Sequence, residues 1–290
     1  MQIRKPVVAR QFYPGLRDDC IAEIEQYLRE ACLPTVLPDK IVAGIVPHAG
    51  WMFSGALAAL VFAALKSQYE TIEVFVLLGA AHNYFGSKPA VGTEEYWETP
   101  LGRIEVNKDL VHRLLETEWA AASSSAHRTE HSIEVQVPFV QYAFPKAQIC
   151  PIVVPPTPKA IPLGQWLGQW IHDQGKPVVC LASTDLTHYG PRYGFVPKGS
   201  GRDGIQWAAQ VNDRRFIDLA IAMEPQQILA ETAENANACG PGAAAACVAA
   251  AKELGKTSGQ LLAYTNSHCV MADKMDTFSL DSVGYAAMVF

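Results

Sequence analysis

The sequence predicts an α/β protein with a central, largely parallel sheet flanked by helices on both faces. Apolar segments of strand length alternate along the chain with longer segments of helical periodicity. No internal repeat, low-complexity tract or long linker interrupts this alternation. Residues 1–290 are therefore expected to fold as a single domain.

The first predicted strand covers residues 41–47, which are almost entirely apolar. An apolar helix is predicted at residues 54–66, with Ser54 as its N-cap. Residues 71–79 form the next strand, again apolar along its length, as expected of a strand buried on both faces. This strand–helix–strand order is the unit from which parallel sheets are built.

A short strand at residues 103–107 precedes an amphipathic helix at 108–116, with Asn107 as the helix cap. Helical spacing of apolar residues predicts a helix at 132–144, where Pro138 falls within the first two turns and is tolerated. The remaining elements repeat the alternation. They are predicted strands at 147–155, 177–183, 260–267 and 282–290 and predicted helices at 162–173, 204–223 and 241–254.

The composition is that of a globular protein, with 49% hydrophobic and 18% charged residues. The net charge of −6 and the lack of a Lys/Arg cluster argue against binding to nucleic acid or to an anionic membrane. The N-terminus has no apolar segment long enough for a signal peptide. Residues 41–65 lack charged side chains, but Pro47, His48 and Gly50 interrupt them, which favours strand–turn–helix over a membrane span. A cytoplasmic location is expected.

Polar side chains follow three of the predicted strands. His48 comes directly after residues 41–47, His82 follows Gly79 by three residues, and Asp185 and His188 follow residues 177–183. In open α/β sheets, ligands bind beyond the carboxyl ends of the strands. These four side chains are therefore candidates for one shared site.

Cys239 lies just before a Gly-Pro-Gly segment that opens the Ala-rich helix at 241–254. A helix N-terminus favours the thiolate form of cysteine, although a cysteine beside glycines can also be present only for its small size. With His48 and His82, this thiolate would complete a three-ligand metal site with open positions. Histidine and cysteine suit iron, zinc or copper. His188, held by Asp185, would then be free for acid–base chemistry.

His131 and Glu134 are candidates to line the site, although no strand precedes them. Glu134 also suits a simpler role as a carboxylate in the first turn of a helix. His112, His127 and His172 are expected to be solvated. The six cysteines other than Cys239 are expected to pack as free, buried thiols. They are Cys20, Cys32, Cys150, Cys180, Cys247 and Cys269.

The chain resembles the Memo family of bacteria, archaea and eukaryotes. Six stretches spread over residues 4–246 carry the resemblance, in the family's order. They are RKPVVARQFYPG, GIVPHAGWMFSG, VLLGAAHN, EHSIEVQVPF, ASTDLTHYG and CGPGAAAA. The family's fold is similar to that of class III extradiol ring-cleavage dioxygenases, which are non-haem iron enzymes with two histidine ligands and one glutamate ligand.

The resemblance implies that His48 and His82 match the histidine ligands and that His188 matches the catalytic histidine of these dioxygenases. Asp185 matches the Memo family's aspartate in the same motif. Cys239 stands where the dioxygenases carry glutamate, so ring cleavage does not follow from the fold. Family members are described as iron- or copper-binding redox proteins and also as adaptors that bind peptides. In prokaryotes the family is associated with a radical-SAM protein.

Three functions follow as hypotheses. The leading one is a metal-dependent oxidoreductase of unknown small-molecule or peptide substrate, with Fe(II) at the site and copper or zinc as alternatives. The second is a peptide- or protein-binding module that uses the same pocket. Nearby aromatic side chains could line a groove there, although ordinary packing is the favoured role for them. The third is a cysteine hydrolase with Cys239 as nucleophile and His188 as base. The aromatic side chains are Phe12, Tyr13, Trp51 and Tyr189.

Overall fold

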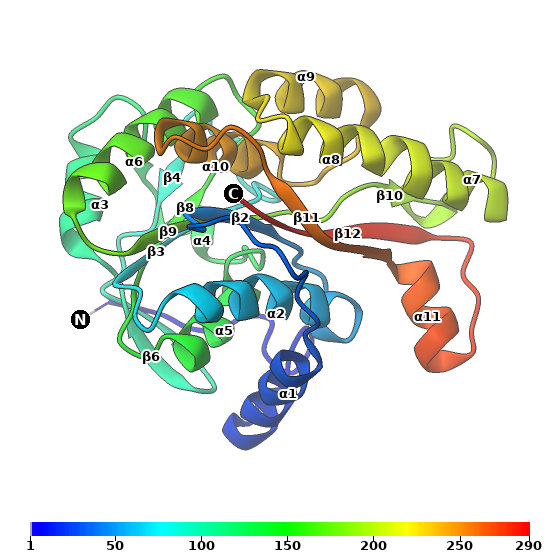
Figure 1. The fold of residues 1–290 in the computed structure, drawn as a ribbon, viewed down its shortest axis with the longest axis horizontal. Coiled ribbons are helices and arrows are strands. Elements are labelled where there is room, and N and C mark those ends of the chain that lie inside the picture. The colour runs from blue at the N-terminus through cyan, green and yellow to red at the C-terminus, as the bar shows by residue number, and fades with distance from the viewer. Residues whose placement is uncertain (1) are drawn as a thin grey trace.

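A computed structural model describes residues 2–290 of the chain. Its centre is a nine-stranded sheet with the order β10-β12-β2-β9-β3-β8-β4-β7, in which β11 pairs with β12 (Figure 1). The strands are β2 (Ala43–Val46), β3 (Val74–Gly79), β4 (Ala90–Val91), β7 (Ala121–Ala122), β8 (Gln148–Val153), β9 (Val178–Ser183), β10 (His188–Tyr189), β11 (Gln260–Asn266) and β12 (Ser282–Val289).

The four central strands β2, β9, β3 and β8 run parallel, whereas β12 pairs antiparallel with β2 and β4 pairs antiparallel with β8. Every residue of β2, β3 and β9 is buried, because helices cover both faces of the sheet. A second, smaller sheet has three strands. Its strands are β1 (Ile3–Arg4), β5 (Tyr96–Thr99) and β6 (Gly102–Glu105). The α/β prediction is confirmed.

The helices form two layers, with α6, α8, α9 and α10 above the sheet in Figure 1 and α1, α2 and α5 below it. The long ones are α1 (Arg17–Glu30), α2 (Trp51–Gln68), α3 (Lys108–Leu115), α6 (Ala160–Gln174), α8 (Asp213–Ile221), α9 (Pro225–Asn235), α10 (Pro241–Glu253) and α11 (Ser267–Met275). The short ones are α4 (Ser124–His127), α5 (Val137–Ala143), α7 (Arg202–Trp207), η1 (Glu134–Gln136), η2 (Pro191–Tyr193) and η3 (Ala208–Asn212).

Three predicted helices can be compared with the structure in detail. Asn107 caps α3 as predicted, because its side chain accepts a hydrogen bond from Leu110 N at 2.8 Å. Ser54 is not the cap of α2, which begins at Trp51 after Gly50; its hydroxyl donates to Ala49 O instead. The helix predicted at 204–223 contains a π-helical turn, η3, between α7 and α8.

Helix α10 is buried from Pro241 to Ala251 and packs against α6 and against strands β2, β3 and β9. The helices approach closely because α6 presents glycines to α10. A Cβ atom on Gly164 would lie 2.1 Å from Ala246 O. At the start of α10, a Cβ atom on Gly240 would lie 2.7 Å from Ser183 O, at the end of β9. Small residues therefore set the position of α10 against the sheet.

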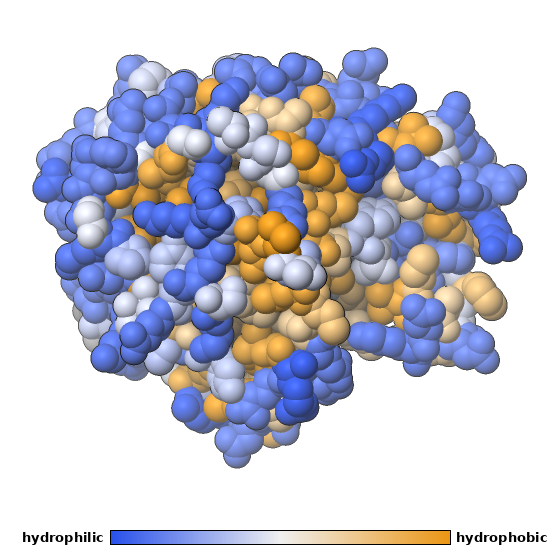
Figure 2. All heavy atoms as spheres, viewed as in Figure 1, coloured by the Kyte–Doolittle hydropathy of each residue, from blue (hydrophilic) through white to orange (hydrophobic). Residues whose placement is uncertain are grey.

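Helix α2 is the one helix within residues 2–290 that is long and apolar enough to cross a membrane, with a mean hydropathy of 1.2. In the fold, 61% of this segment is buried, and it packs against β2, β12 and α5. It therefore serves as a core helix of the domain. Figure 2 shows hydrophobic residues gathered where β11 crosses the middle of this face, with hydrophilic residues over the outer helices. Strand β11 lies at the edge of the sheet, and its side chains are only partly buried.

Candidate metal centre

Three adjacent strands deliver the candidate ligands to one edge of the sheet. Strands β2, β9 and β3 are neighbours, and His48 and His82 follow β2 and β3. His48 is 2% exposed, whereas His82 is partly buried. The ring centroids of the two histidines are 5.2 Å apart and the rings are nearly perpendicular, at 88°. The strand-end argument therefore predicted a real convergence of side chains.

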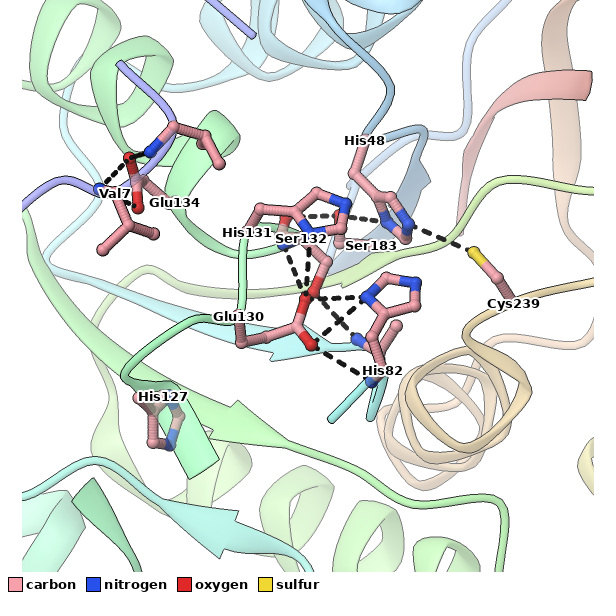
Figure 3. A network of polar contacts seen from close by, with 12 residues as sticks. Val7, His48, His82, His127, Glu130, His131, Ser132, Glu134, Ser183 and Cys239 are labelled. Atoms are coloured by element: carbon pink, nitrogen blue, oxygen red, sulfur yellow. Dashed lines mark hydrogen bonds and ion pairs between the residues drawn. The ribbon is translucent and has the colours of Figure 1, made fainter. Parts of the chain in front are cut away.

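His131 joins these two histidines from the loop before η1 (Figure 3). One ring nitrogen from each of His48, His82 and His131 lies within 4.8 Å of the others, so this group could hold a metal ion. The His82 and His131 rings are stacked, with centroids 4.7 Å apart and planes 9° from parallel. The His48 ring stands at 89° to the His131 ring.

Cys239 reaches the same place from the segment before α10. Its Sγ atom lies 3.1 Å from His48 Nε2, and the His82 ring faces the same sulfur (Figure 3). The backbone fixes this position, because Cys239 N donates to Asp185 O at 3.1 Å and Asp185 N donates to Cys239 Sγ at 3.3 Å. The structure thus brings His48, His82 and Cys239 together.

The electrostatics of these groups are strongly coupled. Burial alone would lower the pKa of His82, but hydrogen bonds with Cys239 and Glu130 outweigh it and raise this pKa to about 10. Burial would raise the pKa of Glu130, but its hydrogen bond with His82 lowers it to about 2. Burial, with the neighbouring His82, lowers the pKa of His48. Glu130 and His82 therefore form an ion pair in which Glu130 is buried and His82 is partly buried.

The prediction that the helix N-terminus favours the Cys239 thiolate is not upheld. Burial raises the pKa of this thiol, and contact with His82 offsets the effect only in part. Cys239 therefore remains a thiol near neutral pH, and a metal ion that binds it must displace a proton.

The expected pairing of Asp185 with His188 is wrong. The Asp185 carboxylate accepts a hydrogen bond from His48 N at 2.6 Å, and within residues 2–290 no hydrogen bond or ion pair joins it to His188. Residues 186–189 run along β12, and residues three apart in extended chain point to opposite sides. Burial raises the pKa of Asp185 to about 7, whereas burial, together with the neighbouring His82 and His131, lowers the pKa of His188 to about 4.

The donor set suits a divalent transition metal. Two imidazole nitrogens and one sulfur meet at a buried edge, with a third imidazole beside them. Nearby, His188 Nε2 is buried and has no hydrogen-bond partner in the described chain, so it is available to a bound group. The residues present therefore fit a metal ion.

Comparison with known proteins decides the family. The family model described as Memo-like protein matches residues 4–289. The chain belongs to the Memo family. A MEMO1 family protein of Pyrococcus furiosus is 37% identical over 303 residues, which cover 99% of this chain and 98% of the relative. One of Thermococcus onnurineus is 35% identical over 300 residues, covering 99% of both chains.

A solved structure, an uncharacterized protein from Escherichia coli K12, is 14% identical and superimposes with a TM-score of 0.49. The match covers 84% of this Memo chain and 99% of that chain. The curated relatives are matched along nearly their whole length, so the family assignment rests on them.

Two residues predicted to line the Memo site lie elsewhere. The Glu134 carboxylate pairs with Arg4 and accepts hydrogen bonds from Val7 N, Val8 N and the Tyr13 hydroxyl. Figure 3 places it beside Val7, away from the histidines. Glu134 therefore anchors the N-terminal segment. Because its partners lie 121 or more residues away in the sequence, local sequence pattern does not predict this role. Tyr189 is fully buried, and its hydroxyl donates to Gly199 O at 2.7 Å.

Ordinary packing, the favoured role for the four aromatic side chains, is confirmed for three of them. Tyr13, Trp51 and Tyr189 are 4%, 2% and 0% exposed and pack in the interior. Phe12 alone reaches the site, where its ring lies 4.9 Å from the His131 ring in an edge-on arrangement. These aromatic side chains therefore do not form a docking surface together.

Three further expectations change. His127 is fully buried, with Nε2 donating to Ala90 O at 2.9 Å, and burial lowers its pKa to about 4. His112 and His172 are exposed as expected. Cys32 and Cys269 are exposed rather than packed.

The sequence analysis missed Glu130, Ser132 and Ser183. Glu130 contacts His82, and Ser183 contacts His48 through Nδ1 at 3.2 Å. The available signals were weak: Ser183 is a hydroxyl at the carboxyl end of a buried strand, and Glu130 precedes His131. Neither position suggests by itself which histidine it serves.

Proposed function

We propose that this Memo-family chain is a metal-dependent oxidoreductase whose metal is held by His48, His82 and Cys239. The observation that carries the proposal is the 3.1 Å contact between Cys239 Sγ and His48 Nε2, with the His82 ring facing the same sulfur (Figure 3). Two imidazoles and a thiolate leave further coordination positions for a substrate or water.

The ring planes favour Cys239 over His131 as the third ligand. The lone pair of an imidazole nitrogen lies in the plane of its ring. Because the stacked His82 and His131 rings are only 9° from parallel, their lone pairs do not converge on one ion. His48 is perpendicular to both rings and can share an ion with either. His131 is then not a ligand, and its ring supports the His82 ring by stacking on it.

Fe(II) is the proposed metal, with copper and zinc as alternatives that a nitrogen–sulfur site also accepts. When bound, such an ion supplies Lewis acidity and, for iron or copper, electron transfer. The chain contributes the proton chemistry. With its pKa lowered to about 4, His188 is a neutral imidazole at neutral pH, and its buried Nε2 has no other partner. It is proposed to accept a proton from the substrate.

Asp185 has a different proposed part, because its carboxylate binds the backbone N–H of His48. It fixes the turn that carries the ligand. Tyr193 is 40% exposed, and the centre of its ring lies 5.0 Å from that of the His188 ring. Its side chain is proposed to line the entrance by which a substrate reaches His188.

The test is anaerobic loading of the purified protein with Fe(II), Cu(I) or Zn(II), compared with a variant in which His48, His82 and Cys239 are all replaced by alanine. The wild type should bind one equivalent. Nitric oxide added to the Fe(II) form should give the electron paramagnetic resonance signal of a high-spin iron–nitrosyl centre, which requires an open position. Equal, weak binding by both proteins for every metal would refute the proposal.

A further inference from the structure

We infer that the segment Glu130–Ser132 holds a proton on Nδ1 of both proposed histidine ligands, so that Nε2 is the nitrogen that each presents to the centre. Glu130 acts on His82 directly, and Ser132 acts on His48 through Ser183. Glu130, Ser132 and Ser183 are thus positioning residues. This role rests on the proposed metal centre, but the protonation pattern that it requires is a property of the chain itself.

On His82, the Glu130 carboxylate faces Nδ1. The distances from His82 Nδ1 to the two carboxylate oxygens are 3.0 and 3.2 Å. A carboxylate only accepts hydrogen bonds, so Nδ1 must carry the proton. The same carboxylate accepts from His82 N at 3.1 Å and Ser132 N at 2.9 Å, which fixes its orientation. Nε2, on the other side of the ring, faces Cys239 (Figure 3).

On His48, the direction of the hydrogen bonds follows from the single proton of a hydroxyl. Ser183 Oγ donates that proton to Ser132 O at 2.6 Å. Toward His48 Nδ1, at 3.2 Å, Ser183 Oγ can then only accept, so Nδ1 carries the proton. The Gln136 amide also donates to Ser183 Oγ, at 3.3 Å, which reinforces this direction. His48 Nε2 is left with its lone pair toward Cys239 Sγ.

The network is buried and isolated from water. Glu130, Ser132, Ser183 and Gln136 are all 2% exposed or less. The Ser132 hydroxyl also accepts a hydrogen bond from Ala80 N at 3.0 Å, directly after β3, and so ties the segment to the strand that carries His82. One short segment therefore reaches the ends of both β3 and β9.

The chemical consequence concerns affinity. A carboxylate or hydroxyl on the far nitrogen of a ligand histidine fixes the ring and raises its basicity, and loss of such a partner lowers metal affinity about 10–100-fold. Glu130→Gln should have this effect, because an amide offers one acceptor oxygen to three N–H donors. Ser183→Ala removes the acceptor for His48 Nδ1, whereas Ser183→Thr retains a hydroxyl.

The experiment is ¹⁵N-histidine nuclear magnetic resonance of the full chain, with and without Zn(II), together with Zn(II) titration by competition with a chelator. The wild type should show a proton on Nδ1 of both His48 and His82 before and after Zn(II) is added. Ser183→Ala should give a tautomer mixture at His48 alone and Glu130→Gln a change at His82 alone, each with affinity lowered about 10–100-fold. Ser183→Thr should restore the wild-type pattern.

Glu134→Gln is the matched control, since Glu134 is equally buried and pairs with Arg4, and within residues 2–290 no hydrogen bond or ion pair joins it to a histidine. It should leave both tautomers and the affinity unchanged. A wild-type His48 that carries its proton on Nε2 would overturn the inference even if a variant failed to fold. Wild-type Zn(II) affinity in Glu130→Gln and Ser183→Ala would also overturn it. The proposed metal centre fails separately, if the wild type shows both Nδ1 protons yet binds no metal.

Discussion

Cys239 Sγ and His48 Nε2 lie 3.1 Å apart although 191 residues separate them in the sequence. The contact joins the carboxyl end of β2 to the amino end of α10, two elements that meet where parallel strands end. A thiol and an imidazole at this distance share a proton or share a metal ion. Both possibilities make Cys239 the residue whose replacement tells most about the site.

Replacement of Cys239 by serine should lower Zn(II) and Co(II) affinity by at least about tenfold, or ~1.4 kcal/mol. A serine hydroxyl does not ionise near neutral pH and is a harder donor than a thiolate. The Co(II) form of the wild type should show a thiolate-to-metal charge-transfer absorption band that Cys239→Ser lacks. Cys32→Ser, at an exposed cysteine, is the control and should keep the band and the affinity. An unchanged band in Cys239→Ser would exclude this sulfur as a ligand.

Replacement of His131 by phenylalanine tests whether His131 binds the metal or only stacks on His82. Phenylalanine retains a flat ring that can stack on His82 but has no nitrogen donor. Metal affinity measured by chelator competition should stay within about threefold of wild type. His82→Phe, which removes a proposed ligand, should abolish binding. If His131→Phe loses as much affinity as His82→Phe, the three histidines are the ligand set.

Stability should depend on pH through Asp213, which accepts hydrogen bonds from Thr187 N and the Tyr264 hydroxyl. Burial raises its pKa to about 7, against about 3.9 in the unfolded chain. The folded form then binds the proton more tightly. Its contribution is therefore fully present below about pH 4 and is lost as the pH rises to about 7, by up to about 1.4 kcal/mol per pH unit.

Urea unfolding of wild type and Asp213→Asn, from about pH 4 to about pH 7.5, measures this dependence. The free energy of unfolding of the wild type, relative to the variant, should decrease across this range. The asparagine variant keeps an acceptor for Thr187 N but does not titrate. A difference that stays constant with pH would show that Asp213 is ionised in both states.

Gly164→Ala should destabilise the fold, although alanine in a helix normally gains about 1 kcal/mol over glycine. Here the added Cβ atom would lie 2.1 Å from Ala246 O, so α6 and α10 must separate. The expected net cost is about 1–3 kcal/mol or more. Gln165→Ala, at the exposed neighbouring position of α6, should leave the thermal midpoint nearly unchanged. A stabilised Gly164→Ala variant would contradict this packing.

Arg4→Met should cost about 3–5 kcal/mol, because it leaves the buried Glu134 carboxylate without its cation. The comparison is Arg113→Met, which breaks the exposed Arg113–Asp109 pair and should cost no more than about 1 kcal/mol. Chemical denaturation of both variants gives the two free energies. Equal costs would mean that the N-terminal segment does not depend on its tie to Glu134.

The sequence predicted the elements that follow from local pattern. Apolar runs located the parallel strands, and the strand-end rule found His48 and His82 because it depends only on the order of strand and turn. Cys239 was found from the break that precedes α10. These positions need no knowledge of how distant segments pack.

The parts that were missed depend on distant segments. Glu130 meets His82 across 48 residues and Ser183 meets Ser132 across 51, through a loop without periodicity. The Asp185–His188 pairing failed for the opposite reason, since it was inferred from closeness in sequence alone. In an extended chain, side chains three residues apart point to opposite sides. Closeness in the sequence therefore does not imply contact between them.

The glycines around α10 have a consequence for the size of ion that the centre can hold. Gly240 and Gly242 bring the start of α10 against main-chain oxygens of Ser183 and Pro155, so that no side chain acts as a spacer. The sulfur of Cys239 is thus carried by contact between backbones. Backbone packing therefore sets the distances between this sulfur and the nitrogens of the two imidazoles, as the framework of a rigid chelating ligand sets the distances between its donor atoms. The backbone around α10 would then determine which ionic radius the centre accepts. Among metal ions of similar radius, the nitrogen and sulfur donors would determine which one binds.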